Sequence, residues 1–189
     1  MTQLSLRPQD VLVLAKLLSY RGRRPTMAQM SVDLSISSSE VHAALRRLEI
    51  SRLVSSGPEG HRPLLGAVQE FLVHGLKYAF PARRGEVTRG VPTSYAAPPL
   101  NRLINAGPGP PPVWPYPEGK QRGVGIEPMY KTVPEAALRD PFLHELLALI
   151  DALRDGRARE RVLAEKELLN RLREQPDGQS QPHPPRGRS

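Results

Sequence analysis

Residues 26–54 read TMAQMSVDLSISSSEVHAALRRLEISRLV, and this stretch decides the fold. Ser37 and Glu40 have the spacing of a helix N-cap and its reciprocal third residue. Apolar residues on either side of Ser37 recur at helical spacing, which predicts a short helix over residues 26–34 and a longer one over residues 37–51. Two short helices joined by a tight turn form a helix-turn-helix unit.

The sequence on both sides of this unit extends the pattern. Pro8 is suited to the first turn of a helix, and the apolar residues after it predict a helix over residues 8–20. Downstream, two short extended pieces flank the turn Gly57-Pro58-Glu59-Gly60, which predicts a β-hairpin in the position of a wing. A fourth amphipathic helix is expected over residues 67–79.

The helix predicted over residues 37–51 has one apolar side and one polar side. Val41, Leu45 and Leu48 form the apolar stripe that packs inward, so the opposite side can enter a major groove. Short hydroxyls at the start of this helix suit phosphates, and arginines farther along reach phosphates or guanine edges. Arg62 is the expected phosphate contact of the wing. The residues predicted to contact DNA are Ser38, Ser39, His42, Ala43, Arg46, Arg47, Arg62, Arg23 and Arg24.

The pattern over residues 26–54 resembles bacterial winged-helix transcriptional regulators, most nearly the MarR-like group. The residues that carry the resemblance are Ala28, Leu34, Ile36, Ser37, Val41, Leu45, Leu48, Leu53 and Val54. Ser35 and the pair Ser51-Arg52 stand where those regulators commonly carry glycine, so other residues must supply these turns. The resemblance implies a winged-helix fold and DNA binding.

Residues 81–134 differ in composition from the residues before them, because more than half of the 21 prolines of the chain fall there. This density predicts an irregular segment, with a plain linker as the default. Trp114 and several tyrosines make the segment too apolar to stay free in water. The favoured hypothesis is an extended wrap that fills grooves on the block formed by residues 1–80.

The chain returns to helical periodicity over residues 135–174, which predicts a pair of amphipathic helices interrupted at Asp155-Gly156. Their apolar stripes exceed what one hairpin can cover, so they are expected to pack against the fourth helix or against a second subunit. The alternative is that they only complete the core of one chain. Residues 175–189 are expected to be a disordered tail. The predicted dimerisation residues are Phe142, Leu146, Ile150, Leu153 and Leu169.

Composition excludes several classes of protein. The chain has no cysteine, so disulfide scaffolds and thiolate metal sites are ruled out. Its five histidines lack ligand spacing, and phosphate-loop and nucleophile-elbow motifs are missing, so no metal, no cofactor and no enzymatic activity are expected. No apolar run approaches the roughly 20 residues of a membrane span, and no export signal is recognisable. These features predict a cytoplasmic protein.

The patterns together predict a mainly α fold: a winged helix-turn-helix with a short β-hairpin wing, an irregular Pro-rich wrap and a C-terminal helical pair. The net charge of +8 falls mostly on the first two parts and favours nucleic acid as a partner. The predicted function is a sequence-specific transcriptional regulator that binds double-stranded DNA as a homodimer. The alternatives are a protein-interaction module, antitoxin-like or adaptor, that binds a heterologous partner, and a ligand-sensing regulator.

Overall fold

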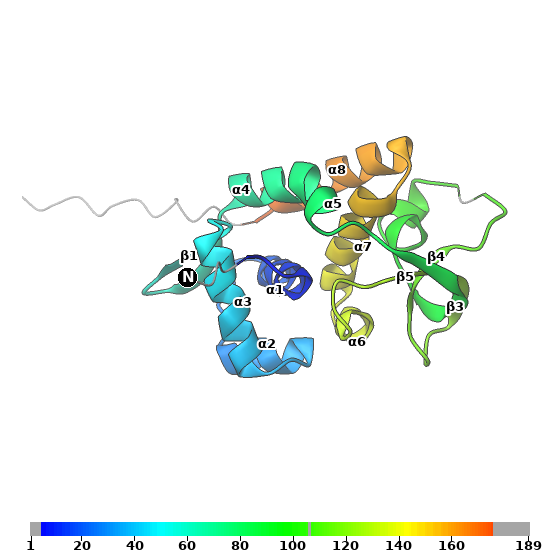
Figure 1. The fold of residues 1–189 in the computed structure, drawn as a ribbon. Helices are drawn as coiled ribbons and strands as arrows, with labels where there is room; N and C mark the ends of the chain where they lie inside the picture. The colour runs from blue at the N-terminus through cyan, green and yellow to red at the C-terminus, as the bar shows by residue number, and fades with distance from the viewer. Residues whose placement is uncertain (1–4, 106, 176–189) are drawn as a thin grey trace, which may run out of the picture.

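The computed structural model describes residues 5–105 and 107–175, and it shows a mixed fold of helices and two small sheets (Figure 1). The prediction of a mainly α fold is right for the helices and misses the second sheet. The first three helices are α1 (Pro8–Ser19), α2 (Met27–Leu34) and α3 (Ser38–Ile50). Each lies within two residues of its predicted bounds.

The caps of α2 and α3 explain where these helices begin. The Thr26 side chain accepts a hydrogen bond from the Gln29 amide at 3.0 Å. In α3 the cap is reciprocal: Ser37 Oγ accepts from the Glu40 amide at 3.2 Å, and Glu40 Oε2 accepts from the Ser37 amide at 3.4 Å. Each bond satisfies a backbone donor that the first turn of a helix leaves unpaired.

The turns after α2 and after α3 use left-handed backbone without glycine. Ser35, directly after α2, has φ 53° and ψ 41°, and Arg52, after α3, has φ 56°. Left-handed backbone costs a residue with a Cβ about 1–2 kcal/mol. The neighbouring packing must therefore hold both turns in place.

The predicted hairpin is present as β1 (Val54–Gly57) and β2 (Gly60–Pro63). The strands are antiparallel, with Gly57 opposite Gly60 and a two-residue turn of Pro58 and Glu59 between them. Gly60 has φ 95°, a backbone conformation that favours glycine.

The fourth helix spans residues 65–79, but its hydrogen bonding changes in the middle. It consists of α4 (Leu65–Glu70), a π-helical turn η1 (Phe71–Gly75) and α5 (Leu76–Ala79). Val68, Leu72 and Leu76 form its buried side.

The segment predicted to be irregular contains a second sheet, so that prediction was wrong. Its strands are β3 (Arg84–Pro92), β4 (Pro112–Pro115) and β5 (Gln121–Ile126). β3 pairs antiparallel with both other strands, and β4 pairs parallel with β5, which closes the sheet on itself. The turns η2 (Ser94–Ala96) and η3 (Leu100–Arg102) follow β3.

Closure of three strands leaves no room for a side chain at Gly90 or Gly123. A Cβ on Gly123 would lie 2.0 Å from the carbonyl oxygen of Pro111, and one on Gly90 would lie 2.0 Å from that of Trp114. The glycines that read as loop signals in the sequence are therefore the residues that let the strands approach.

The second sheet packs against α7 (Pro141–Asp155), not over the N-terminal helices as the wrap hypothesis predicted (Figure 1). Trp114 is 1% exposed, and its Nε1 donates to Asp151 Oδ2 on α7 at 2.6 Å. Thr93 Oγ1 donates to the same oxygen at 2.9 Å. The segment is thus ordered, as the apolar residues suggested, but on a different support.

The C-terminal region forms three helices where two were predicted. They are α6 (Val133–Arg139), α7 and α8 (Ala158–Arg173). Asp140 separates α6 from α7, because its Oδ1 accepts from the amides of Phe142 and Leu143 at 3.1 and 3.0 Å. Pro141 then occupies the first position of α7.

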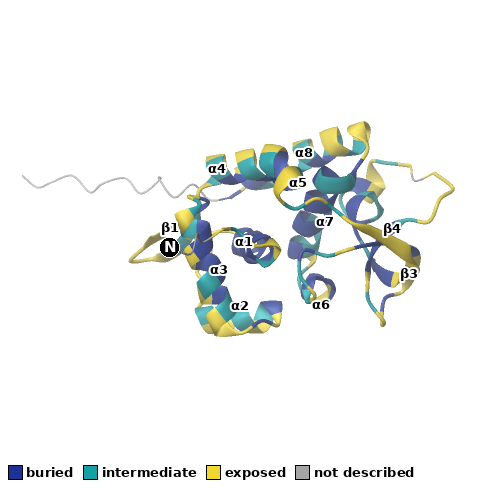
Figure 2. Ribbon diagram, viewed as in Figure 1, coloured by how far each residue is buried: buried dark blue, intermediate teal, exposed yellow. Residues whose placement is uncertain are grey.

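Helix α7 is the central helix of the chain and is buried along most of its length (Figure 2). It contacts α1, α6, α8 and the sheet segment. Three of the predicted dimerisation residues, Leu146, Ile150 and Leu153, are at most 4% exposed, so the prediction that they join two subunits was wrong. Phe142 on α7 and Leu169 on α8 are half-buried, and for these two the role stays a prediction.

Gln175 is the one residue of the predicted tail that the structure describes, and the prediction of disorder was wrong for it. Gln175 is buried, and its side-chain amide donates to the carbonyl oxygen of Leu18 at 3.1 Å. Residues 176–189, the rest of the predicted tail, lie outside the described residues. Within the described residues, no helix has both the length and the apolar character needed to span a membrane.

The contact between α7 and β3 gives the first prediction. His144 Nε2 lies 2.7 Å from the carbonyl oxygen of Pro92, and the ring packs 5.3 Å from that of Trp114. Burial lowers the pKa of His144 below its ordinary 6.5, so the unfolded chain takes up this proton first. The free energy of unfolding should therefore fall as the pH drops below about 6.5.

Denaturant melts between pH 7.5 and pH 5 measure this effect. His144→Gln cannot gain the proton, so its free energy of unfolding should depend less on pH than that of the parent chain. Identical pH slopes for the two proteins would refute the role of His144.

Candidate nucleic-acid interface

The outward side of α3 carries most of the residues predicted to contact DNA. Ser38, Ser39, His42 and Arg46 are exposed, and Ala43 is half-buried. Residues 39, 42 and 46 follow one another at spacings of three and four, so they share one face of the helix. The structure thus brings hydroxyls, an imidazole and a guanidinium together on one open surface.

The opposite side of α3 holds the helix in place. Val41, Leu45 and Leu48 are at most 1% exposed, and α3 packs on both α1 and α2. This arrangement is the one that the apolar stripe predicted.

Arg47 does not belong to the outward face, so its predicted contact with DNA was wrong. Its side chain is 4% exposed and forms two hydrogen bonds with Asp10 of α1. Arg47 Nε lies 2.8 Å from Asp10 Oδ2, and Nη2 lies 2.6 Å from Oδ1. The hydrogen bonds that Arg47 donates to Asp10 raise the pKa of Arg47.

Asp10 also caps the N-terminus of α1. Its Oδ2 accepts a hydrogen bond from the backbone amide of Arg7 at 2.8 Å. One buried carboxylate therefore caps α1 and neutralises the arginine that anchors α3.

The arginines around the hairpin share one acidic partner. Arg24 Nη2 lies 2.6 Å from Glu59 Oε2 at the hairpin turn, and Arg62 forms an ion pair with the same carboxylate. Arg23 donates from Nε to the carbonyl oxygen of Tyr20 at 3.3 Å and is exposed. All three arginines predicted to contact DNA here are thus exposed, and the carboxylate of Glu59 neutralises part of their positive charge.

Two residues from the later part of the chain, Tyr130 and Arg139, hold the turn between α2 and α3 in place. Arg139 Nη1 donates to Ser35 Oγ at 2.9 Å and to the carbonyl oxygen of Val32 at 3.3 Å. Tyr130 donates from its hydroxyl to Glu40 Oε1 at 3.3 Å. Sequence reasoning missed these contacts, because they join residues about 90 or more positions apart and leave no local signal.

A cleft of about 650 Å³ lies between the loop after α1 and the junction of α6 with α7. At its base Lys16 Nζ lies 3.1 Å from Asp33 Oδ2 and 2.8 Å from Asp140 Oδ2. Burial opposes ionisation of both acids, but hydrogen bonds from Lys16 and other donors outweigh it and lower both pKa values. The charged groups at the base are paired with one another, so they join the N-terminal helices to α7.

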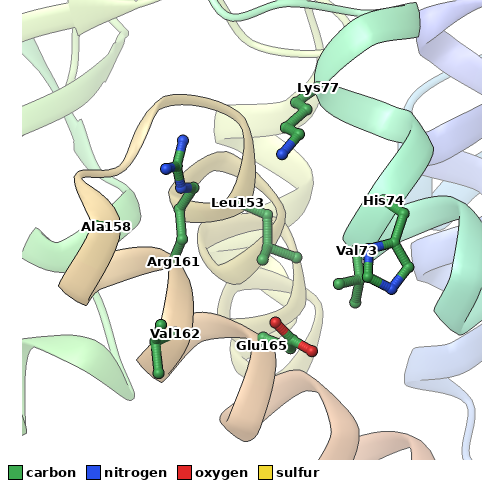
Figure 3. Close-up of a pocket in the computed structure, with 8 residues that line it drawn as sticks. All are labelled: Val73, His74, Lys77, Leu153, Ala158, Arg161, Val162 and Glu165. Carbon is green, nitrogen blue, oxygen red and sulfur yellow. The ribbon is translucent and has the colours of Figure 1, made fainter.

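A second, smaller pocket of about 240 Å³ lies between the fourth helix and α8 (Figure 3). Lys77, Arg161 and Glu165 stand at its edges, and Val73 and Leu153 are buried in its floor. Ligand pockets usually measure about 300–1,000 Å³. This pocket therefore gives little support to the ligand-sensing alternative.

In the part of the chain that the structure describes, no group of three or more acidic or histidine side chains is arranged to hold a metal ion. Comparisons of this chain with protein-family models, with curated proteins and with solved structures found no match.

Proposed function

We propose that this chain is a winged helix-turn-helix protein that binds double-stranded DNA, with α3 in the major groove. The order of elements supports the proposal: three helices, with α3 capped by serine, are followed directly by a two-stranded hairpin. The observation that carries it is the open face of α3, where Arg46 is exposed while the helix is held from behind.

Arg46 is the cation of α3 that can read or grip DNA, since Arg47 is held by Asp10. A guanidinium can contact guanine with two hydrogen bonds or bind a phosphate. The serines at the start of α3 meet the backbone, where helix amides favour anions. Arg62 on the hairpin would touch the backbone beside the groove that α3 enters.

A transcriptional regulator is the role that we propose for such a domain, as the resemblance to MarR-like regulators implies. The homodimer stays a prediction, and α7 does not supply its surface, since its apolar residues pack within the chain. Sedimentation at micromolar concentration tests it, because a single 21.0 kDa species would refute the dimer.

The protein-interaction alternative was based on exposed apolar helices over residues 135–174. Most apolar residues of α7 are buried, but Leu138 on α6 is 58% exposed and Val162 on α8 is 66% exposed, so a heterologous partner would find a smaller apolar surface than expected. The open face of α3 makes DNA binding the function that we propose first.

Replacing Arg46 with alanine tests the proposal. If Arg46 reaches a base, affinity for the preferred duplex should fall about 5- to 150-fold, which corresponds to about 1–3 kcal/mol. If it reaches a phosphate, the slope of log affinity against log salt should decrease by about one unit. Fluorescence anisotropy with labelled duplexes between about 50 and 200 mM salt measures both quantities.

Arg159→Ala is the matched control, because Arg159 is an exposed arginine on α8, away from α3. It should leave the affinity and the salt slope nearly unchanged. Equal effects of Arg46→Ala and Arg159→Ala would contradict the docking of α3.

A further inference from the structure

We infer that the outward face of β3 and β5 is a second surface for nucleic acid, centred on Arg89 and Arg122. The two residues stand directly opposite each other in the antiparallel pair. Directly opposed residues share one face of a sheet, with Cβ atoms about 4.5–5.5 Å apart. Both arginines are exposed.

The inward side of this strand pair is closed by the chain segment that enters β4. A Cβ on Gly123, the neighbour of Arg122, would point inward and lie 2.0 Å from the carbonyl oxygen of Pro111 in that segment. Val87 and Val124 form the next pair on the outward face, and Val87 is 47% exposed. Figure 2 shows that much of β3 is exposed.

Like charges directly opposite each other destabilise a sheet. Elsewhere on this sheet basic residues have acidic partners: Arg84 Nη2 lies 2.8 Å from Asp155 Oδ2, and Arg83 Nε lies 3.9 Å from Glu127 Oε2. Within residues 5–105 and 107–175, no carboxylate lies within 4.0 Å of Arg89 or Arg122. The fold thus places two exposed arginines without a carboxylate partner directly opposite each other on adjacent strands.

A phosphate is the group that resolves this repulsion. Guanidiniums bind phosphate oxygens through strong charge-assisted hydrogen bonds, and two of them about one strand spacing apart can hold one phosphate between them. Lys120 lies just before β5, two positions from Arg122, and adds a third positive charge. Glu118 in the turn before β5 and Glu86 on β3 are the acids nearest in sequence.

A nucleic-acid backbone fits this surface because it presents phosphates in a row and demands no particular base. The excess positive charge of the chain favours the same partner. The valine pair beside the arginines has no side-chain hydrogen-bond donors, so it cannot recognise particular bases. Binding here should be independent of sequence and sensitive to salt.

This second surface lies at the opposite end of the molecule from α3. Figure 1 shows α3 and the hairpin at one end and the second sheet at the other, with α1 and α7 between them. A short duplex bound by α3 therefore leaves this face free for another duplex. The inference rests on the proposed function in one respect: a count of two duplexes per chain requires that α3 binds one of them. The sheet can bind DNA without α3.

The test counts duplexes bound per chain by sedimentation at about 50 mM salt. The probe is a random duplex of about 12 base pairs, slightly longer than one helical turn. The parent chain should bind two duplexes, and Arg122→Glu should bind one. Arg159→Glu, which changes the net charge equally on α8, should still bind two.

Thermal melting of the same variants shows whether Arg122→Glu stays folded. The substitution places Glu opposite Arg89, which replaces repulsion with attraction, so the melting temperature should equal or exceed that of the parent chain. Arg89→Glu, the mirror variant, should give the same loss of one duplex.

The outcomes separate the two proposals. If α3 does not bind DNA, the parent chain binds one duplex, Arg46→Ala leaves that binding intact and Arg122→Glu abolishes it. If Arg122→Glu and Arg159→Glu bind the same number of duplexes with the same affinity, the second surface is refuted.

Discussion

Replacing Asp10 with alanine should lower the free energy of unfolding by about 3–5 kcal/mol, because it leaves the guanidinium of Arg47 buried without its partner. Arg47 is 4% exposed and Asp10 is fully buried. The same change removes the side chain that accepts from the Arg7 amide at the start of α1. Urea melts followed by far-ultraviolet circular dichroism measure the loss.

The double variant Asp10→Leu/Arg47→Met separates a lost ion pair from lost packing. It removes both charges and keeps similar volume, so it should recover much of the stability that Asp10→Ala loses. A drop of less than about 1 kcal/mol for Asp10→Ala would be typical of an exposed pair and would contradict this burial.

Asp151 is the second residue whose loss should be severe, again by about 3–5 kcal/mol on substitution by alanine. Its carboxylate is 1% exposed and accepts hydrogen bonds from Trp114, Thr93 and Arg154. Burial raises the pKa of Asp151, and these donors oppose that rise. Removing the carboxylate leaves the donors of Trp114 and Arg154 without this acceptor inside the protein.

Trp114 is the single tryptophan of the chain, so its fluorescence reports on this contact directly. The emission of Asp151→Ala should shift to longer wavelength at lower urea than that of the parent chain. Thr93→Val is the graded control, because it removes one neutral donor and should cost only about 1 kcal/mol. Equal stabilities of Asp151→Ala and Thr93→Val would show that the carboxylate does not join the sheet to α7.

The N-terminal helices and the hairpin could be predicted because each has its signal within a few residues. Ser37 and Glu40 mark the start of α3, and Gly57 with Gly60 mark the hairpin turn. The caps and turn residues act locally, so their sequence spacing is enough to place them.

The second sheet could not be predicted by the same reasoning. β4 begins and ends with proline, and β5 contains Gly123 and Gly125, so neither strand shows an alternating pattern. Gly123 is required, because a Cβ there would lie 2.0 Å from the carbonyl oxygen of Pro111, whereas a Cβ on Gly125 would be crowded at 3.2 Å from that of Glu86. A composition typical of loops here results from the geometry of a closed sheet.

The open polar face of α3 could be predicted from the sequence, but the assignment of Arg47 to that face was wrong. Arg46 and Arg47 are neighbours in the sequence, but one is exposed and the other lies at the edge of the buried stripe. The partner of Arg47 is Asp10, 37 positions away, and no local pattern connects them. The predicted dimerisation role of Leu146, Ile150 and Leu153 was wrong for a similar reason, since the length of an apolar stripe does not reveal which surface covers it.

Backbone amide shifts in a titration with duplex DNA test the central claim most directly, because they locate the contact on the chain. We expect the largest changes at Ser38, Ser39, His42 and Arg46 of α3 and at the hairpin around Arg62. Any changes on β3 and β5 should vanish in Arg122→Glu while those on α3 persist. Duplex binding that leaves the amides of α3 unperturbed would contradict the account.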